Sequence, residues 1–95
     1  MPRQSQEKDH YNDLIFVSLY RLRAKPRTLI TYWKTIKSVA EYNNVPKERV
    51  KLALDNLLRQ KYIQESEQVG YNGKIVDVLI VDWDRVQKDG IWSKN

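Results

Sequence analysis

The sequence contains no cysteine and only a few glycines, and these absences exclude several classes of protein. Without cysteine there is no disulfide, no zinc finger and no thiol nucleophile. The three glycines, Gly70, Gly73 and Gly90, do not form a phosphate-binding loop. The single histidine, His10, has no second histidine or cysteine with which to bind a metal. We therefore expect a protein that is not an enzyme and has no cofactor and no metal site.

Long apolar runs are missing as well. No stretch approaches the roughly 18 residues of a membrane span, and the first ten residues, MPRQSQEKDH, are polar and carry both charge signs, unlike a secretory signal. A chain of 95 residues with 41% hydrophobic residues suits one folded domain. The sequence therefore predicts a cytoplasmic protein with no membrane partner.

Acidic residues are absent between Asp13 and Glu41. Residues 1–61 hold 13 of the 17 basic residues and 6 of the 12 acidic ones, so the excess of positive charge lies in this part of the chain. Such an asymmetry favours a polyanionic partner, although a basic surface can also serve solubility alone. The acid-free segment contains six basic residues: Arg21, Arg23, Lys25, Arg27, Lys34 and Lys37.

Hydrophobic periodicity predicts two helices in the first half of the chain. Apolar residues recur at helical spacing over residues 9–24, and Lys25-Pro26 ends this helix because the residue before proline disfavours the helical conformation. Residues 29–33, LITYW, are β-branched and aromatic and predict a short strand. Thr35 then caps a second helix that ends at Asn43-Asn44.

The second half of the chain predicts one more helix and a hairpin. Residues 46–61 repeat apolar residues at helical spacing, with a proline in the first turn. Residues 63–71 and 74–83 flank Asn72-Gly73, the strongest short signal for a β-hairpin. The fold class is therefore α+β, with three helices, a short strand and a C-terminal hairpin.

This order resembles a winged helix-turn-helix DNA-binding domain. Such domains place a small residue in the first helix of the motif, a left-handed residue in the turn and a β-branched residue in the next helix, and these positions hold Ala40, Asn44 and Val50. The stretch SVAEYNNVPKERVKLALDNLLRQKYI is similar to the GntR-type and MarR-type versions of the motif. It departs from them at Pro46, where a capping Ser or Thr is usual, and at Lys61-Tyr62, where a glycine is usual.

The resemblance covers residues 11–82 and implies a function. It divides the chain into a flexible tail (1–8), the winged helix-turn-helix domain (9–83) and an apolar-aromatic tail that can form a short helix (84–95). It implies a sequence-specific double-stranded DNA-binding protein with helix 46–61 in the major groove, most simply a homodimeric transcriptional regulator. Self-contained regulators of this length resemble those of phages, plasmids and archaeal viruses. The alternative is a winged-helix adaptor that binds proteins of a replication or transcription complex. RNA binding through the tyrosines is a third reading, without a recognisable RNA module.

Helix 46–61 carries the candidate base contacts. Its outward face holds Glu48, Leu52, Asp55, Asn56 and Arg59, flanked by Arg49 and Lys51. Asn56 suits adenine, Arg49 suits guanine and Leu52 suits a thymine methyl group. Glu48 can accept a hydrogen bond from cytosine, but it and Asp55 repel phosphates, and they can equally form ion pairs on a solvated face. The candidate phosphate contacts are Lys34, Thr35, Lys37 and Lys47 at the helix starts, with Asn72 and Lys74 at the wing tip.

The first helix and the chain end carry a second apolar signal. Phe16, Val17 and Tyr20 lie away from the predicted core side of helix 9–24, and Ile91 and Trp92 lie near the C-terminus. Two explanations are open: the tail folds back over the helix, or these residues form a two-fold dimer interface. The dimer is the favoured one. It would place two recognition helices about 34 Å apart on a palindromic site.

Overall fold

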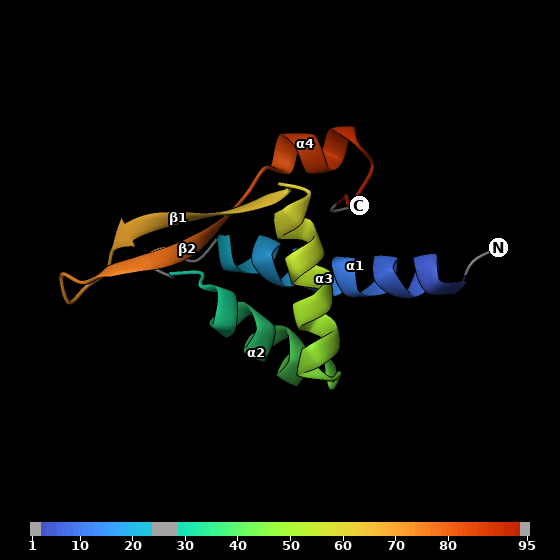
Figure 1. Cartoon of the computed structure of the whole chain (residues 1–95), viewed down its shortest axis with the longest axis horizontal. Helices are drawn as coiled ribbons and strands as arrows, with labels where there is room; N and C mark the ends of the chain where they lie inside the picture. The colour runs from blue at the N-terminus through green and yellow to red at the C-terminus, as the bar shows by residue number, and fades with distance from the viewer. Residues whose placement is uncertain (1–2, 24–28, 94–95) are drawn as a thin grey trace.

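The computed structural model describes residues 3–23 and 29–93, with side chains from His10 onward. The fold is α+β: three helices are followed by a two-stranded antiparallel hairpin and a short fourth helix (Figure 1). None of the helices in this described part is long and apolar enough to cross a bilayer. The elements are α1 (Arg3–Arg23), α2 (Tyr32–Asn43), α3 (Lys47–Arg59), β1 (Ile63–Val69), β2 (Ile75–Val81) and α4 (Trp83–Lys88).

Helix α1 begins earlier than the sequence predicts. Its first residue is Arg3, so residues 3–8, predicted as a tail, have a helical backbone, while Met1 and Pro2 lie outside the described residues. The predicted helix end at Lys25-Pro26 also lies outside them, and the described helix ends at Arg23. Among its described side chains, Ile15, Phe16 and Leu19 are fully buried.

The predicted strand at residues 29–33 is wrong, because α2 begins at Tyr32. The side-chain oxygen of Thr31 accepts a 3.4 Å hydrogen bond from the backbone N–H of Lys34, so Thr31 caps this helix and Thr35 lies one turn inside it. The cap outweighs the β-propensity of LITYW, which is a weak and context-dependent preference. A trace of extended pairing remains, since the N–H of Leu79 donates to the carbonyl of Ile30 at 2.7 Å.

The turn between α2 and α3 is built on Asn44. Asn44 has the left-handed φ and ψ of 54° and 51°, and its N–H donates to the carbonyl of Ala40. The sequence predicts this end of α2 correctly, because asparagine tolerates the left-handed conformation. Pro46 precedes α3 at the cap position without a side-chain cap. The turn fixes the angle at which α3 leaves α2.

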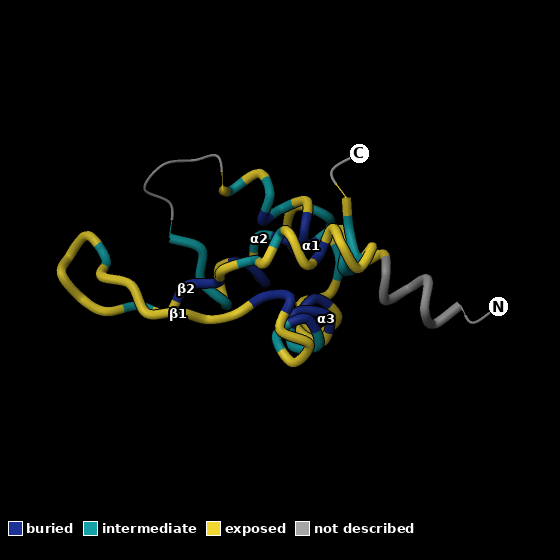
Figure 2. Tube along the Cα trace, turned by 90° about the horizontal axis from the view of Figure 1, so that it is seen from above, coloured by how far each residue is buried: buried dark blue, intermediate teal, exposed yellow. Residues whose placement is uncertain are grey.

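The hairpin follows α3 directly and projects away from the helices (Figure 1). Lys61, with φ 65°, makes the bend before β1, and Gly73, with φ 81°, makes the turn between the strands. The register places Val69 opposite Ile75 and Glu67 opposite Asp77. Beyond the helices, most of the hairpin is exposed (Figure 2).

One core joins α1, α2, α3 and the start of the hairpin (Figure 2). Ala40 and Val50 are both buried where α2 and α3 meet, as a close helix crossing requires. The other fully or nearly fully buried apolar residues are Ile15, Phe16, Leu19, Ile36, Val39, Ala53, Leu54, Leu57, Tyr62, Ile63, Val78, Leu79 and Val86.

The C-terminal tail folds back onto α1 within the same chain. Phe16 is fully buried and stacks on Trp92 with a ring distance of 6.0 Å, while Trp83 packs on both Phe16 and Tyr20. The assignment of Phe16 to an exposed dimer interface is therefore wrong. Tyr20, Ile91 and Trp92 are only partly exposed, and of the five predicted interface residues only Val17 is classed as exposed. The error arises because α1 packs on α2 and α3 with one side and on the tail with another.

Candidate functional site

Cationic side chains of α2 and α3 gather on one surface, which we call the α2–α3 face. A groove between the two helices is lined by Trp33, Ile36, Lys37, Lys47, Glu48 and Lys51. Trp33 is 67% exposed at the start of α2, and Leu52 is 62% exposed on the outer side of α3. Lys37, Lys47 and Lys51 line the groove, whereas the other exposed cations of the two helices lie outside it: Lys34, Arg49 and Arg59.

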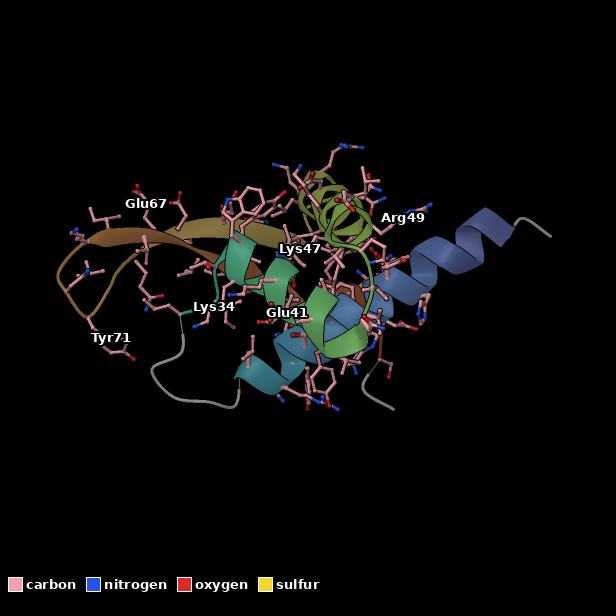
Figure 3. All side chains as sticks on the ribbon, turned by 90° about the horizontal axis from the view of Figure 1, so that it is seen from below. Lys34, Glu41, Lys47, Arg49, Glu67 and Tyr71 are labelled. Carbon is pink, nitrogen blue, oxygen red and sulfur yellow. The ribbon has the colours of Figure 1, made fainter. Side chains whose placement is uncertain are left out.

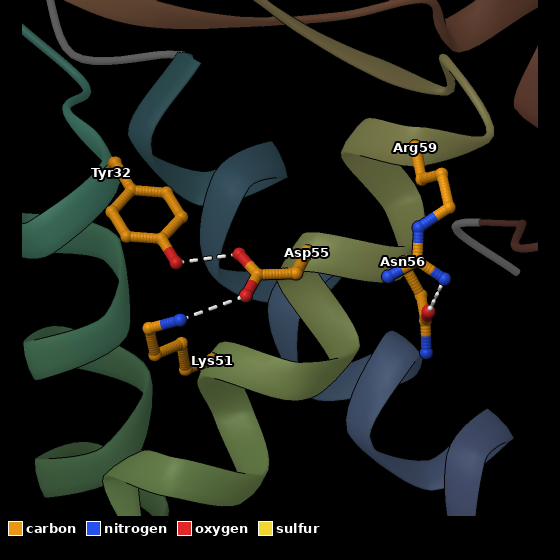
Figure 4. Close-up of polar contacts among 5 residues, drawn as sticks. All are labelled: Tyr32, Lys51, Asp55, Asn56 and Arg59. Atoms are coloured by element: carbon orange, nitrogen blue, oxygen red, sulfur yellow. Dashed lines mark hydrogen bonds and ion pairs between the residues drawn. The ribbon is translucent and has the colours of Figure 1, made fainter.

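The sequence predicts that Asp55 points outward from α3, but its side chain points toward α2 (Figure 4). The Tyr32 hydroxyl donates a 2.5 Å hydrogen bond to one oxygen of this carboxylate, and the Lys51 ammonium lies 2.9 Å from the other. Burial acts to raise the pKa of the Asp55 carboxyl, but the hydrogen bonds from Tyr32 and Lys51 outweigh it and hold this pKa below its ordinary value. Burial and the bond to Asp55 raise the pKa of the Tyr32 phenol, which keeps its proton.

The same contacts change the electrostatics of the face. Asp55 remains ionised, yet its charge is compensated by Lys51, so it repels an approaching anion much less than a free carboxylate would. Glu48 stays exposed and lines the groove beside Lys37 and Lys47. The outward face of α3 therefore exposes one acid, Glu48, among its cations instead of two.

Asn56 and Arg59 form a pair on the opposite flank of α3 (Figure 4). A guanidinium N–H of Arg59 donates a 3.0 Å hydrogen bond to the side-chain oxygen of Asn56, which is half-buried. Bidentate recognition of adenine needs this oxygen as an acceptor. Because an amide oxygen can accept two hydrogen bonds, Asn56 keeps one acceptor position and both N–H donors for a base, and Arg59 lies beside it.

Of the four phosphate contacts predicted at the helix starts, three are exposed and one is buried. Lys34 and Lys37 are exposed there, and Lys47 is exposed at the start of α3. Thr35 is only 1% exposed, so its assignment as a contact residue is wrong. Because α2 begins at Tyr32, Thr35 falls on the inner side of the helix with Ile36 and Val39. Its hydroxyl has no hydrogen-bond partner in the described part of the chain.

The hairpin tip offers little positive charge. Lys74 and Asn72 are exposed, but the side-chain oxygen of Asn72 accepts a 3.1 Å hydrogen bond from the N–H of Lys74 and so shapes the turn. Behind the tip, Glu65 and Asp77 line a hollow together with residues of α2 and α3, among them Tyr32 and Asp55. Figure 3 shows Glu67 on the same hairpin, well apart from Arg49 at the start of α3. The hairpin is acidic where the α2–α3 face is basic.

Two residues of this surface are missed by the sequence reasoning. The sequence assigns Tyr32 and Trp33 to a strand, so it predicts neither the contact of Tyr32 with Asp55 nor the exposed indole of Trp33. The residue that indicates the true start of α2 is Thr31. Threonine is a favoured N-cap, and its side chain binds the N–H of Lys34, three residues later.

Searches against protein families, curated proteins and solved structures found no match for this chain. Among the described residues, no group of three His, Asp or Glu side chains lies close enough together to hold a metal ion.

Proposed function

We propose that this chain is a winged helix-turn-helix protein that binds double-stranded DNA with α3 in the major groove. The observation that carries the proposal is the arrangement of the α2–α3 face, with an exposed α3, a left-handed Asn44 turn and cations at both helix starts. The 13 residues of α3 make a helix about 20 Å long and about 10–12 Å across with side chains, a diameter that fits a major groove about 12 Å wide.

Different residues of this face have different tasks in the proposal. Lys34, Lys37 and Lys47 bind phosphates and release counterions, which supplies affinity without sequence preference. Leu52, Arg49 and Asn56 contact base edges. Trp33 packs against the sugar-phosphate backbone beside Lys37.

Two classes of variant test this assignment in titrations of labelled duplexes of several sequences. Lys37→Glu and Lys47→Glu should weaken binding to all sequences alike. Arg49→Ala and Asn56→Ala should instead reduce the preference among sequences, by about 1–3 kcal/mol at the base concerned. If the two classes behave identically, α3 does not read bases.

We further propose that the regulator is a homodimer that pairs through α1. Asp13, Val17 and Arg21 are exposed and lie four residues apart along this helix, beside a groove that α1 forms with α2. If two copies of α1 cross antiparallel at Val17, Asp13 of each copy lies against Arg21 of the other. The two-fold axis therefore forms this contact twice. The polar residues are thus self-complementary around a central apolar contact.

A charge swap tests the dimer by sedimentation equilibrium. Asp13→Arg or Arg21→Asp alone should shift the protein toward monomer, since each places like charges together. The double variant should restore the dimer. A wild-type protein that remains monomeric at ~100 µM would contradict this part of the proposal.

A further inference from the structure

Within the described part of the chain, strand β1 has one edge without a partner strand. The sheet has two strands in the described part of the chain, so β1 pairs with β2 alone. Leu79 in β2 donates its N–H away from β1, to the carbonyl of Ile30. Leu79 lies opposite Glu65, and in an antiparallel pair two opposite residues direct their backbone groups either toward each other or both away. The N–H and C=O of Glu65 therefore point outward, and those of Glu67 and Val69 follow by alternation.

The side chains beside this edge are acidic. Glu65, Glu67 and Asp77 share one face of the hairpin, and all three are exposed. The register places Glu67 directly opposite Asp77, an arrangement that destabilises a hairpin because like charges repel at this distance. Neither strand contains a lysine or an arginine. Near the tip, the exposed pair Val69 and Ile75 adds an apolar contact.

The acidic side chains and the outward backbone groups of this edge indicate which kind of molecule it can bind. Nucleic acid is repelled by the three carboxylates. A second copy of β1 would bring Glu65 and Glu67 against their own counterparts, which disfavours pairing of this edge with itself. An extended segment with alternating basic residues satisfies both features, because its backbone completes the hydrogen bonds and its charges relieve the Glu67–Asp77 repulsion.

We propose that β1 is a docking edge for an extended, lysine- or arginine-rich segment of a protein partner, which adds to the hairpin as a third strand. The segment forms backbone hydrogen bonds with Glu65 and Glu67, and its basic side chains face the carboxylates of β1 and β2. The edge belongs to the hairpin, and none of its residues lines the groove between α2 and α3, although Glu65 and Asp77 share a hollow with Trp33.

A synthetic peptide provides the probe. It has eight residues, alternates lysine with threonine or valine, and carries an acetyl and an amide cap. Its fluorescence anisotropy with the full chain should rise to saturation, and the amide signals of Glu65 and Glu67 should shift and exchange more slowly with solvent. A version N-methylated at every residue keeps the charge but has no N–H donors, and it should bind at least ~10-fold more weakly.

Two matched pairs of variants distinguish the effect of the acids of β1 on peptide binding from the effect of the net charge of the protein. The pair Glu65→Gln and Glu67→Gln should weaken peptide binding ~10-fold or more, whereas Glu41→Gln with Asp84→Asn, the same charge change on α2 and α4, should change it less than ~2-fold. Neither pair should weaken duplex binding, so failure here is distinguishable from failure of the DNA proposal. Equal binding of the N-methylated peptide, equal effects of the two pairs, or no binding of the probe would each overturn the proposal.

Discussion

Asp55 adds less negative charge to the surface of α3 than its position in the sequence indicates. Its position in the sequence indicates an outward acid on α3, but Tyr32 and Lys51 hold the carboxylate against α2. Because Tyr32 comes from α2, the contact joins the two helices of the turn unit. The interaction stabilises the helix pair and also reduces the repulsion that a free carboxylate would exert on an anion.

Asp55→Asn should destabilise the protein by about 1 kcal/mol at pH 7, since it removes an ion pair and weakens a hydrogen bond. The pKa of Asp55 is lower in the folded state, so its contribution is present above the ordinary value of 3.8 and is lost as the pH falls through the folded pKa. Urea unfolding at pH 7 and at pH 2.5 measures this. The difference between wild type and variant should shrink at the lower pH, and an unchanged difference would contradict the role assigned to the carboxylate.

Two substitutions test whether Thr35 belongs to the buried side of α2. Its buried hydroxyl has no partner in the described part of the chain, so Thr35→Val should leave stability unchanged or raise it by up to about 1 kcal/mol. Duplex affinity should not change. Thr35→Ser, which keeps the hydroxyl and removes a buried methyl group, should lose about 1 kcal/mol in the same thermal and urea unfolding experiments. A fall in duplex affinity for the valine variant alone would restore Thr35 as a contact residue.

At the scale of elements, α3 and the hairpin are predicted to within two residues. Their signals are local: an apolar stripe at helical spacing and an Asn-Gly turn between β-rich runs. The segment 29–33 is mispredicted because its β-propensity competes with a capping threonine. The wrong placement of Phe16 has a different cause. Periodicity shows that α1 is apolar on two sides, but it does not show whether the second side meets the tail or another molecule.

Trp92 in the tail and Trp33 at the start of α2 allow a matched comparison of two tryptophan substitutions. Trp92→Ala should cost about 2–3 kcal/mol in urea unfolding, because its partly buried ring stacks on Phe16 and packs on Trp83. Trp33→Ala removes a ring that is 67% exposed, so its cost should stay below about 1 kcal/mol, while duplex affinity falls. Equal losses of stability would show that the tail does not cover α1.

Two contacts fix α4 relative to the hairpin. The Tyr62 hydroxyl donates a 2.7 Å hydrogen bond to Asp89, and the Arg85 guanidinium lies 4.4 Å from the centre of the Tyr62 ring. Tyr62→Phe should therefore destabilise the protein by about 1 kcal/mol. It should leave duplex binding unchanged, since Tyr62 is buried at the bend before β1 and away from the α2–α3 face. A loss of duplex affinity without a loss of stability would contradict this placement.

The whole molecule separates its charges. The α2–α3 face is basic, and the hairpin bears Glu65, Glu67 and Asp77. The sequence predicts this division, because the basic excess ends at residue 61 and the acidic excess begins after it. What the sequence does not predict is the compensation of Asp55, which depends on a contact between residues 23 positions apart. The division of charge favours DNA on one surface and a basic protein segment on the other.

If the α2–α3 face binds duplex DNA through its cations, the affinity must fall as the salt concentration rises. Titration of a labelled random duplex at several salt concentrations should give a linear fall of log affinity with log salt, with a slope of about −3 to −5 for a few neutralised phosphates. Lys37→Glu and Lys47→Glu should each reduce the magnitude of that slope by about one or more. No measurable affinity at ~50 mM salt, or a slope that these substitutions leave unchanged, would contradict the claim.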